Sequence, residues 1–137
     1  MPIKVEIISP EKVLVSRDVD MVVMPGEEGD IAAMPEHAPM MLLLRGGIVT
    51  LYDGETPKER YFVGGGFADM TPTRCTILAD EAVPATEISI DEATARLEEL
   101  TEAWGAADKT DVARLEGLMA KIQSVQAEID AGSGNHP

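Results

Sequence analysis

The sequence has 137 residues, of which 45% are apolar and 4% aromatic, and a formal net charge of −14. This length suits one domain, or a small domain with an appendage. The strong acidity argues against nucleic acid and anionic lipid as direct partners, because both require a basic protein face.

Short runs of β-type residues, separated by glycine and proline, fill the first 79 positions. In Ile3–Ile8 apolar and charged residues alternate, which predicts a half-buried strand that begins too early for a signal or transit peptide to precede it. Further strands are predicted at Val13–Val15, Val19–Met24, Ile31–Met34, Met40–Leu44, Ile48–Tyr52, Arg60–Val63, Phe67–Met70 and Thr73–Ala79. The longest apolar run, Met40–Leu44, is too short to span a bilayer. With no helix interleaved, this pattern favours an antiparallel sandwich or barrel.

Two glycine clusters interrupt the strands. Gly46-Gly47 lies between two apolar runs and predicts a hairpin there. Gly64–Gly66 lacks the following Lys-Ser/Thr and the strand-to-helix context of a phosphate-binding loop, so we expect a β-turn or bulge that closes the sandwich. Cys75 is the single cysteine, which fits a reducing compartment, and its strand position predicts burial.

After Asp80 the apolar period becomes helical. Ser89-Ile90-Asp91-Glu92 has the form of a capping box, and Gly105 is expected to end the helix that follows. The first apolar stripe is Ala93, Leu97, Leu100 and Trp104; the second helix, which Thr110 would cap, carries Val112, Leu115, Met119, Ile122, Val125 and Ile129. The predicted fold class is therefore α+β and mainly β, with an N-terminal antiparallel β-sandwich (residues 1–87) and a C-terminal antiparallel two-helix hairpin (residues 88–137) that ends in a frayed tail.

The residues do not form the pattern of a familiar catalytic, cofactor or metal site. His37 would need further nitrogen or sulfur ligands to hold zinc, and His136 lies in the tail. No G-x-S-x-G elbow holds a serine. We therefore expect no enzyme, no cofactor and no metal. Two alternatives stay open: a regulatory module that senses nucleotide through Asp91 and Arg96, and a small enzyme that uses His37 as a base.

The order of five phrases resembles the epsilon subunit of the bacterial proton-translocating (F-type) ATP synthases. The phrases are PG-x-x-G at 25–29, P-x-H-x-P at 35–39, a strand followed by GG, FVGGGF at 62–67 and TILADEA at 76–82. The resemblance covers the whole chain, because the two-helix tail belongs to it. It implies a non-catalytic rotor subunit that binds the gamma subunit, sits on the membrane ring of c subunits and couples proton flow to ATP synthesis. Contacts with the catalytic alpha and beta subunits would be possible, and the chain would lie on the cytoplasmic face of the plasma membrane, attached only through the complex.

The same resemblance suggests site residues. Asp30 and His37 would contact the polar loops of the c-ring, from loops at the end of the sandwich that faces the ring. Some bacterial members bind ATP through I-D-x-x-R-A; here Ile90, Asp91 and Ala95 match, but Thr94 replaces the arginine, so only Arg96 could reach round. Since Asp91 also suits the helix dipole, ATP binding is expected to be weak or absent.

The charge of the helical tail bears on inhibition. From Asp91 to Asp130 there are four basic and ten acidic residues, a net charge of 4 − 10 = −6. In relatives whose tail inhibits ATP hydrolysis, a basic second helix meets an acidic segment of the beta subunit, and an acidic tail would be repelled there. The sequence therefore predicts a tail that stays folded on the sandwich and inhibits weakly or not at all.

Overall fold

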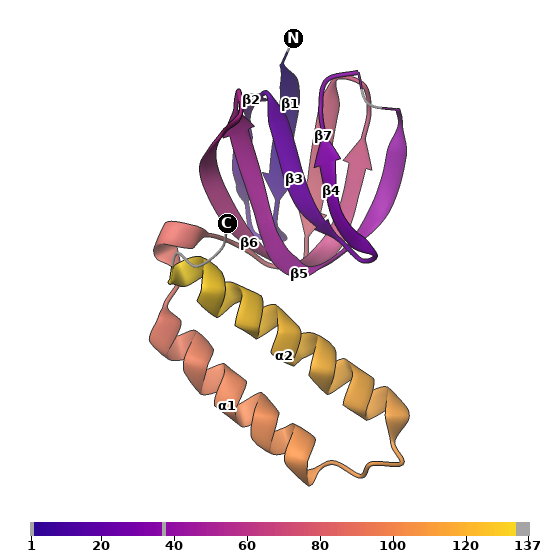
Figure 1. The fold of residues 1–137 in the computed structure, drawn as a ribbon, viewed down its shortest axis with the longest axis vertical. Coiled ribbons are helices and arrows are strands. Elements are labelled where there is room, and N and C mark those ends of the chain that lie inside the picture. The colour runs from indigo at the N-terminus through magenta and orange to yellow at the C-terminus, as the bar shows by residue number, and fades with distance from the viewer. Residues whose placement is uncertain (1, 37, 134–137) are drawn as a thin grey trace.

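The computed structural model describes residues 2–36 and 38–133, and it has a β-sandwich followed by a helical hairpin (Figure 1). The predicted fold class is confirmed. The strands are β1 (Ile3–Ile8), β2 (Val13–Val19), β3 (Met21–Gly26), β4 (Gly29–Ala33), β5 (Met40–Asp53), β6 (Thr56–Met70), β7 (Arg74–Ala79) and β8 (Ala82–Pro84). A 3₁₀ turn, η1 (Ala85–Glu87), leads to α1 (Ile90–Ala106) and α2 (Val112–Gly132).

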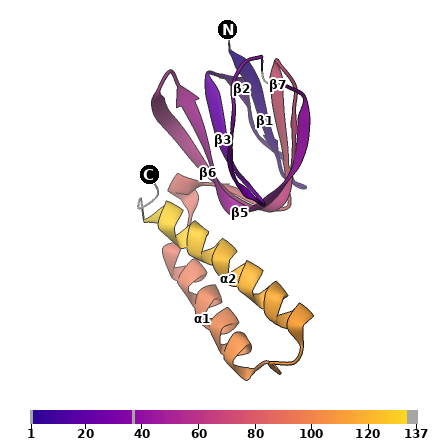
Figure 2. The ribbon, with the colours of Figure 1, turned by 45° about the vertical axis from the view of Figure 1, so that its right-hand side comes forward.

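The strands form one hydrogen-bonded path that curls around its own core (Figure 2). Its order is β2-β1-β7-β6-β5-β3-β4, with β8 added beside β6, so β2 and β4 are the two edges. All pairs are antiparallel except β1 with β7, which run parallel. The predicted alternation in β1 holds, because Ile3, Val5 and Ile7 are fully buried.

The prediction of a hairpin at Gly46-Gly47 is wrong. Strand β5 runs through both glycines, and Gly46 pairs with Gly64 of β6 in the same register as the residues on either side. The turn between these strands lies instead at Gly54, whose φ of +64° suits glycine and whose N–H donates to Asp20 Oδ2 at 2.5 Å. The two glycines thus mark close approaches of β5 to Ser124 of α2 and to Pro25 of β3, and not a reversal of the chain.

The turn or bulge expected at Gly64–Gly66 is likewise replaced by continuous strand. Strand β6 pairs with β8 up to Val63 and with β7 from Gly66 onward, so the glycines mark the point where β6 changes neighbours. Gly66 has a φ of +135°, and a Cβ atom there would lie 2.9 Å from the Ala79 Cα of the next strand. Only glycine allows both the conformation and the close approach.

The helical hairpin begins as predicted but is capped differently at its second helix. The Ser89 hydroxyl accepts the Glu92 N–H at 3.3 Å at the start of α1. Asp111, and not Thr110, caps α2 by accepting the Arg114 N–H at 3.2 Å. The four apolar stripe residues of α1 are buried or half-buried as expected, whereas on α2 Val112 and Met119 are exposed and Leu118 is buried in their place.

Helix α2, and not α1, lies against the sandwich (Figure 2). A small cluster of Ile48, Phe62 and Ala131, with Ala85, Ile88 and Ala127 around it, forms the apolar part of this contact. The cluster is separate from the main core between the sheet layers. The helical hairpin therefore rests on the sandwich through a contact with few apolar side chains.

Candidate functional site

An exposed apolar row crosses the outer face of the sandwich. The strand registers pair residues across five neighbouring strands: Leu43 (β5) with Phe67 (β6), Phe67 with Leu78 (β7), Leu78 with Ile8 (β1), and Ile8 with Val13 (β2). Leu43, Phe67 and Leu78 are each 49 to 50% exposed and Val13 is 56% exposed, while Ile8 is half-buried. We call these five residues the apolar row.

The apolar row exists because outward-facing positions of these strands carry apolar side chains. Their chain neighbours Leu44, Ala68 and Ile77 point into the core and are buried, so the adjacent positions must face outward, where polar residues are usual. Met41, which is 70% exposed, extends the apolar surface two residues along β5. A contiguous exposed apolar surface of this kind marks an interaction site.

A groove of about 870 Å³ separates the apolar row from α2. Leu43 and Phe67 line one side, and Ser124 and Ala127 of α2 line the other. Arg45 and Asp80 are among the charged residues that line the groove. The groove therefore combines exposed apolar side chains with charges of both signs.

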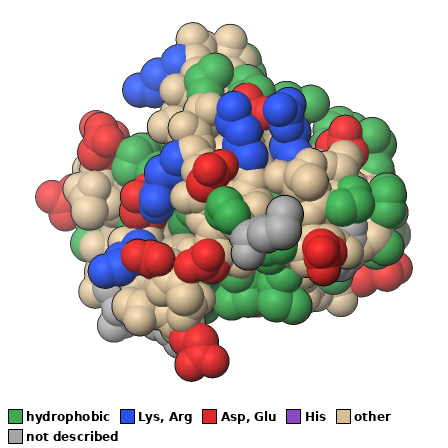
Figure 3. Space-filling model, turned by 90° about the horizontal axis from the view of Figure 1, so that it is seen from above, with side chains coloured by type: hydrophobic (Ala, Val, Ile, Leu, Met, Phe, Trp, Pro, Cys, Tyr) green, Lys and Arg blue, Asp and Glu red, His purple; other side chains and the backbone are tan. Residues whose placement is uncertain are grey.

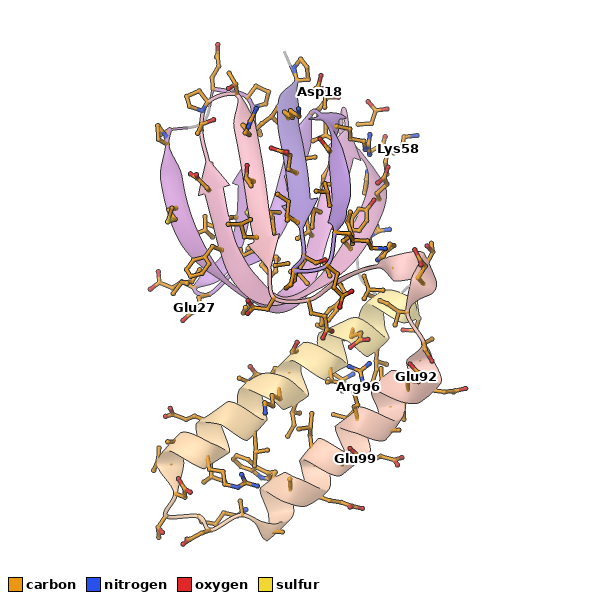
Figure 4. The ribbon with its side chains drawn as sticks, turned by 180° about the vertical axis from the view of Figure 1, so that it is seen from behind. Asp18, Glu27, Lys58, Glu92, Arg96 and Glu99 are labelled. Carbon is orange, nitrogen blue, oxygen red and sulfur yellow. The ribbon has the colours of Figure 1, made fainter. Side chains whose placement is uncertain are left out.

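Beneath the sandwich, Arg96 of α1 and Glu128 of α2 form an ion pair, with Arg96 Nη2 2.9 Å from Glu128 Oε2. Figure 4 shows Arg96 between the two helices. Glu128 is only 5% exposed, and its second oxygen, Oε1, has no hydrogen-bond partner among the described residues. The hydrogen bond to Glu128 raises the pKa of the Arg96 guanidinium. Burying a carboxylate with one unsatisfied oxygen costs free energy of folding. The burial of Glu128 was not predicted from the sequence.

The residues predicted for ATP binding are not brought together. Asp91 is exposed in the first turn of α1, while Arg96 pairs with Glu128. The hollow beside this pair holds about 350 Å³ and is lined by Glu81 and Glu99 as well as by Lys121. A nucleotide phosphate would therefore meet three carboxylates, and the one arginine is already paired.

Of the residues predicted to contact a ring of c subunits, the structure describes Asp30, which lies in the edge strand β4. Asp30 is near its start and pairs with Arg45, with Arg45 Nη2 2.9 Å from Asp30 Oδ1. His37 lies outside the described residues. The turn before it, at Glu36, follows the other end of β4 and has a φ of +67°, with the Glu36 N–H donating to Pro72 O at 2.7 Å. The structure thus separates Asp30 from this turn by the length of β4.

The end of the sandwich away from the helical hairpin mixes side chains of several kinds. Figure 3 shows basic, acidic and hydrophobic side chains interspersed on this face, without a continuous basic surface. Among the described residues, no three His, Cys, Asp or Glu side chains are placed to hold a metal ion. Cys75 is fully buried, as predicted, and burial raises the pKa of its thiol to about 12. None of the described helices is both long and apolar enough for a membrane span.

Comparisons with known proteins identify the relatives of this chain. Residues 2–85 match the family model of the β-sandwich domain of the ATP synthase delta/epsilon chain. The chain is 61% identical over 134 residues to the ATP synthase epsilon chain of Gluconacetobacter diazotrophicus, covering 98% of this chain and 95% of that one. It is 43% identical over 117 residues to the epsilon chain of Rhodospirillum rubrum, covering 82% and 87%.

Two solved structures share the fold. One is a chain of the Euglena gracilis mitochondrial ATP synthase, in a structure of its OSCP, F1 and c-ring, with a TM-score of 0.75 and 22% identity over 92% of this chain and 80% of that one. The other is a chain of the central stalk and c-ring of the Tetrahymena thermophila mitochondrial enzyme, with a TM-score of 0.66 and 12% identity over 96% and 97%. The sandwich and the helical hairpin are therefore both shared with these chains.

Proposed function

The chain belongs to the delta/epsilon chain family of ATP synthase, and from that membership we propose that it is a non-catalytic rotor subunit in the enzyme's central stalk. In this role it links the gamma subunit to the c-ring and helps to couple proton flow to ATP synthesis. The observation that carries the proposal is the apolar row, which lies on the family's sandwich domain and offers a surface for a protein partner.

We assign the apolar row to the gamma subunit. Three of its side chains, Leu43, Phe67 and Leu78, each keep about half of their surface exposed and stand side by side on three hydrogen-bonded strands. Burying such a surface supplies the apolar centre that stable protein interfaces have. A partner seated there would be held by a sheet whose strands are cross-linked by hydrogen bonds, which resists shear when the rotor turns.

We assign the ring contacts to the edge strand β4. Asp30 and His37 remain the proposed contact residues; Asp30 lies in β4, and His37 lies outside the described residues. An edge strand exposes unpaired backbone groups as well as side chains, so it suits polar loops of a ring. Attachment through the ring would make the chain a peripheral protein of the cytoplasmic face of the bacterial plasma membrane.

We propose that the helical hairpin is a weak inhibitor of ATP hydrolysis, or none. Its helices carry a net charge of −6 between residues 91 and 130, and α2 rests on the sandwich. Deleting residues 88–137 from the assembled enzyme should leave the rate of ATP hydrolysis within about twofold of the full-length value, since no charge steers an acidic tail to an acidic segment. A several-fold rise would contradict weak inhibition.

We do not propose nucleotide sensing as a second function. Arg96, the residue that would replace the missing arginine, is paired with Glu128, and Glu81 and Glu99 line the hollow beside them. These carboxylates would repel a triphosphate.

Association with the purified gamma subunit of the same bacterium tests the rotor proposal. Analytical sedimentation of the full chain with gamma should give one faster-sedimenting complex. Sedimentation of the two proteins as separate species, with the chain shown to be folded by circular dichroism, would refute it. A chain with Val112→Asp on α2 should form the same complex with gamma, because Val112 is exposed but lies outside the apolar row.

A further inference from the structure

Met41 has the most exposed large apolar side chain among the described residues. It is 70% exposed, more than Leu43 on the same strand. Because side chains alternate along a strand, Met41 and Leu43 share the outer face, whereas Leu42 packs against the main core. Met41 pairs across the strands with Asp69 and is the diagonal neighbour of Phe67. A thioether therefore stands beside the apolar row and is open to solvent.

An exposed thioether reacts with hydrogen peroxide. One peroxide oxygen is transferred to the sulfur as the O–O bond breaks, so the sulfur is oxidised by two electrons and the products are methionine sulfoxide and water. The reaction needs access to the sulfur and no base or metal from the protein. The aliphatic and aromatic side chains of the apolar row carry no such atom. Met41 is therefore the position at which an oxidant can change this surface.

Other sulfur atoms differ from that of Met41 in access or in place. Met24 and Met70 are fully buried in the main core. Cys75 is buried there too, and burial raises the pKa of its thiol to about 12, so little of the reactive thiolate forms. Met40 is 44% exposed, but alternation places it on the opposite face of β5. Oxidation that alters the outer face should therefore fall on Met41.

The sulfoxide would bring a polar group to an apolar surface. Its oxygen accepts hydrogen bonds, and the residue opposite, Asp69, is exposed and offers only acceptors when it is ionised. On the free chain water satisfies the sulfoxide. A partner that covers the apolar row would remove this water, which costs free energy unless the partner supplies a donor.

We propose that Met41 is a modification site, at which oxidation by peroxide to the sulfoxide weakens the burial of the apolar row by a protein partner. The site is open in the unassembled chain, because a partner seated on the row would also cover Met41. Methionine sulfoxide reductases return the sulfoxide to the thioether, so the change is reversible. The oxidation of Met41 is a property of the chain alone, whereas the identity of the partner as the gamma subunit rests on the proposed function.

Peptide mass spectrometry of the full chain, after brief treatment with hydrogen peroxide, measures oxidation at each methionine. Met41 should be oxidised within about threefold of the rate of free methionine, and Met24 and Met70 at least about 100-fold more slowly, because susceptibility follows exposure. Circular dichroism should be unchanged, since the Met41 side chain is already exposed. Oxidation of Met41 as slow as that of the two buried methionines would overturn the proposal.

Hydrophobic interaction chromatography tests the effect on the surface without any partner. The oxidised chain should elute earlier than the untreated chain, and Met41→Leu, which keeps the apolar area but has no sulfur, should lose most of this shift. Met119→Leu is the matched control and should keep the shift, because Met119 is exposed on α2, outside the apolar row. An undiminished shift in Met41→Leu would assign the change to another methionine, such as Met34 or Met40, and overturn the proposal.

Calorimetric titration with purified gamma subunit measures the effect on assembly. Oxidation should raise Kd by about 10-fold, and treatment with the reductases should restore it. The peroxide-treated Met41→Leu chain should bind like the untreated one. An unchanged Kd after complete oxidation of Met41 would overturn the proposal. If gamma does not bind even the untreated chain, the rotor proposal fails, and the oxidation rates and the chromatography then decide on Met41 by themselves.

Discussion

Replacing Phe67 by Asp should weaken binding of the gamma subunit. Phe67 is 50% exposed and lies between Leu43 and Leu78 in the apolar row. A phenylalanine that becomes fully buried removes about 150–250 Å² from water, so about 100 Å² remains to be covered by a partner here. At about 25 cal/mol per Å² this area contributes about 2.5 kcal/mol, which corresponds to a loss of about 70-fold in affinity. The buried charge of the new Asp adds to that loss.

Isothermal titration calorimetry with purified gamma subunit measures the change in Kd. Val112→Asp provides the control, because Val112 is 60% exposed on α2 and is outside the apolar row, so its affinity should match that of the unmodified chain. Thermal unfolding should show that both variants stay folded, since each side chain is already exposed. A folded Phe67→Asp chain that binds gamma within about threefold of the unmodified affinity would refute the assignment of the apolar row.

Three further outcomes follow from the structure. Gly66→Ala should lower the free energy of unfolding in urea by about 2–4 kcal/mol, because Gly66 has positive φ and a Cβ atom would meet the β7 backbone. Gly117→Ala, in open space on α2, should instead raise the free energy of unfolding by about 0.5–1 kcal/mol. Equal effects of the two substitutions would contradict this reasoning. Stability should fall above pH 9, because burial raises the pKa of Cys75 from 9.0 and of Tyr61 from 10.0 to about 12 in each case, so the unfolded chain loses these protons first. The contribution of Cys75 to the slope of unfolding free energy against pH approaches about 1.4 kcal/mol per pH unit. This contribution should be absent when Cys75→Ala is unfolded in urea across the same pH range. Excess ATP should leave the melting temperature unchanged because Arg96 is already paired, and a reproducible rise would support nucleotide sensing.

The sequence predicted the parts of the fold that depend on local pattern. Alternation identified β1, and the helical period together with Ser89 located the start of α1. The errors lie where distant residues decide the local structure. Gly46-Gly47 has the composition of a hairpin, but its conformation is set by Gly64 in the paired strand and by Ser124 on α2, neither of which is a sequence neighbour.

The candidate site was less accessible from the sequence. Exposed apolar side chains such as Leu43 and Phe67 look like core residues until strand register shows that they share the outer face of the sheet. Glu128 looks like an ordinary solvated acid, and its position three residues after the buried Val125 was the one available signal that it shares the buried face of α2. The ring contacts Asp30 and His37 stay predictions.

The parallel pairing of β1 with β7 has a consequence for the order of folding during synthesis. Ile3–Ile8 leaves the ribosome before one of its two neighbours, Arg74–Ala79, which is made about seventy residues later. Until then β1 can pair only with β2, and a two-stranded hairpin is marginally stable by itself. The sandwich should therefore close late and slowly, as expected for contacts of large sequence separation, while the helical hairpin, whose contacts are local, can form as soon as it emerges.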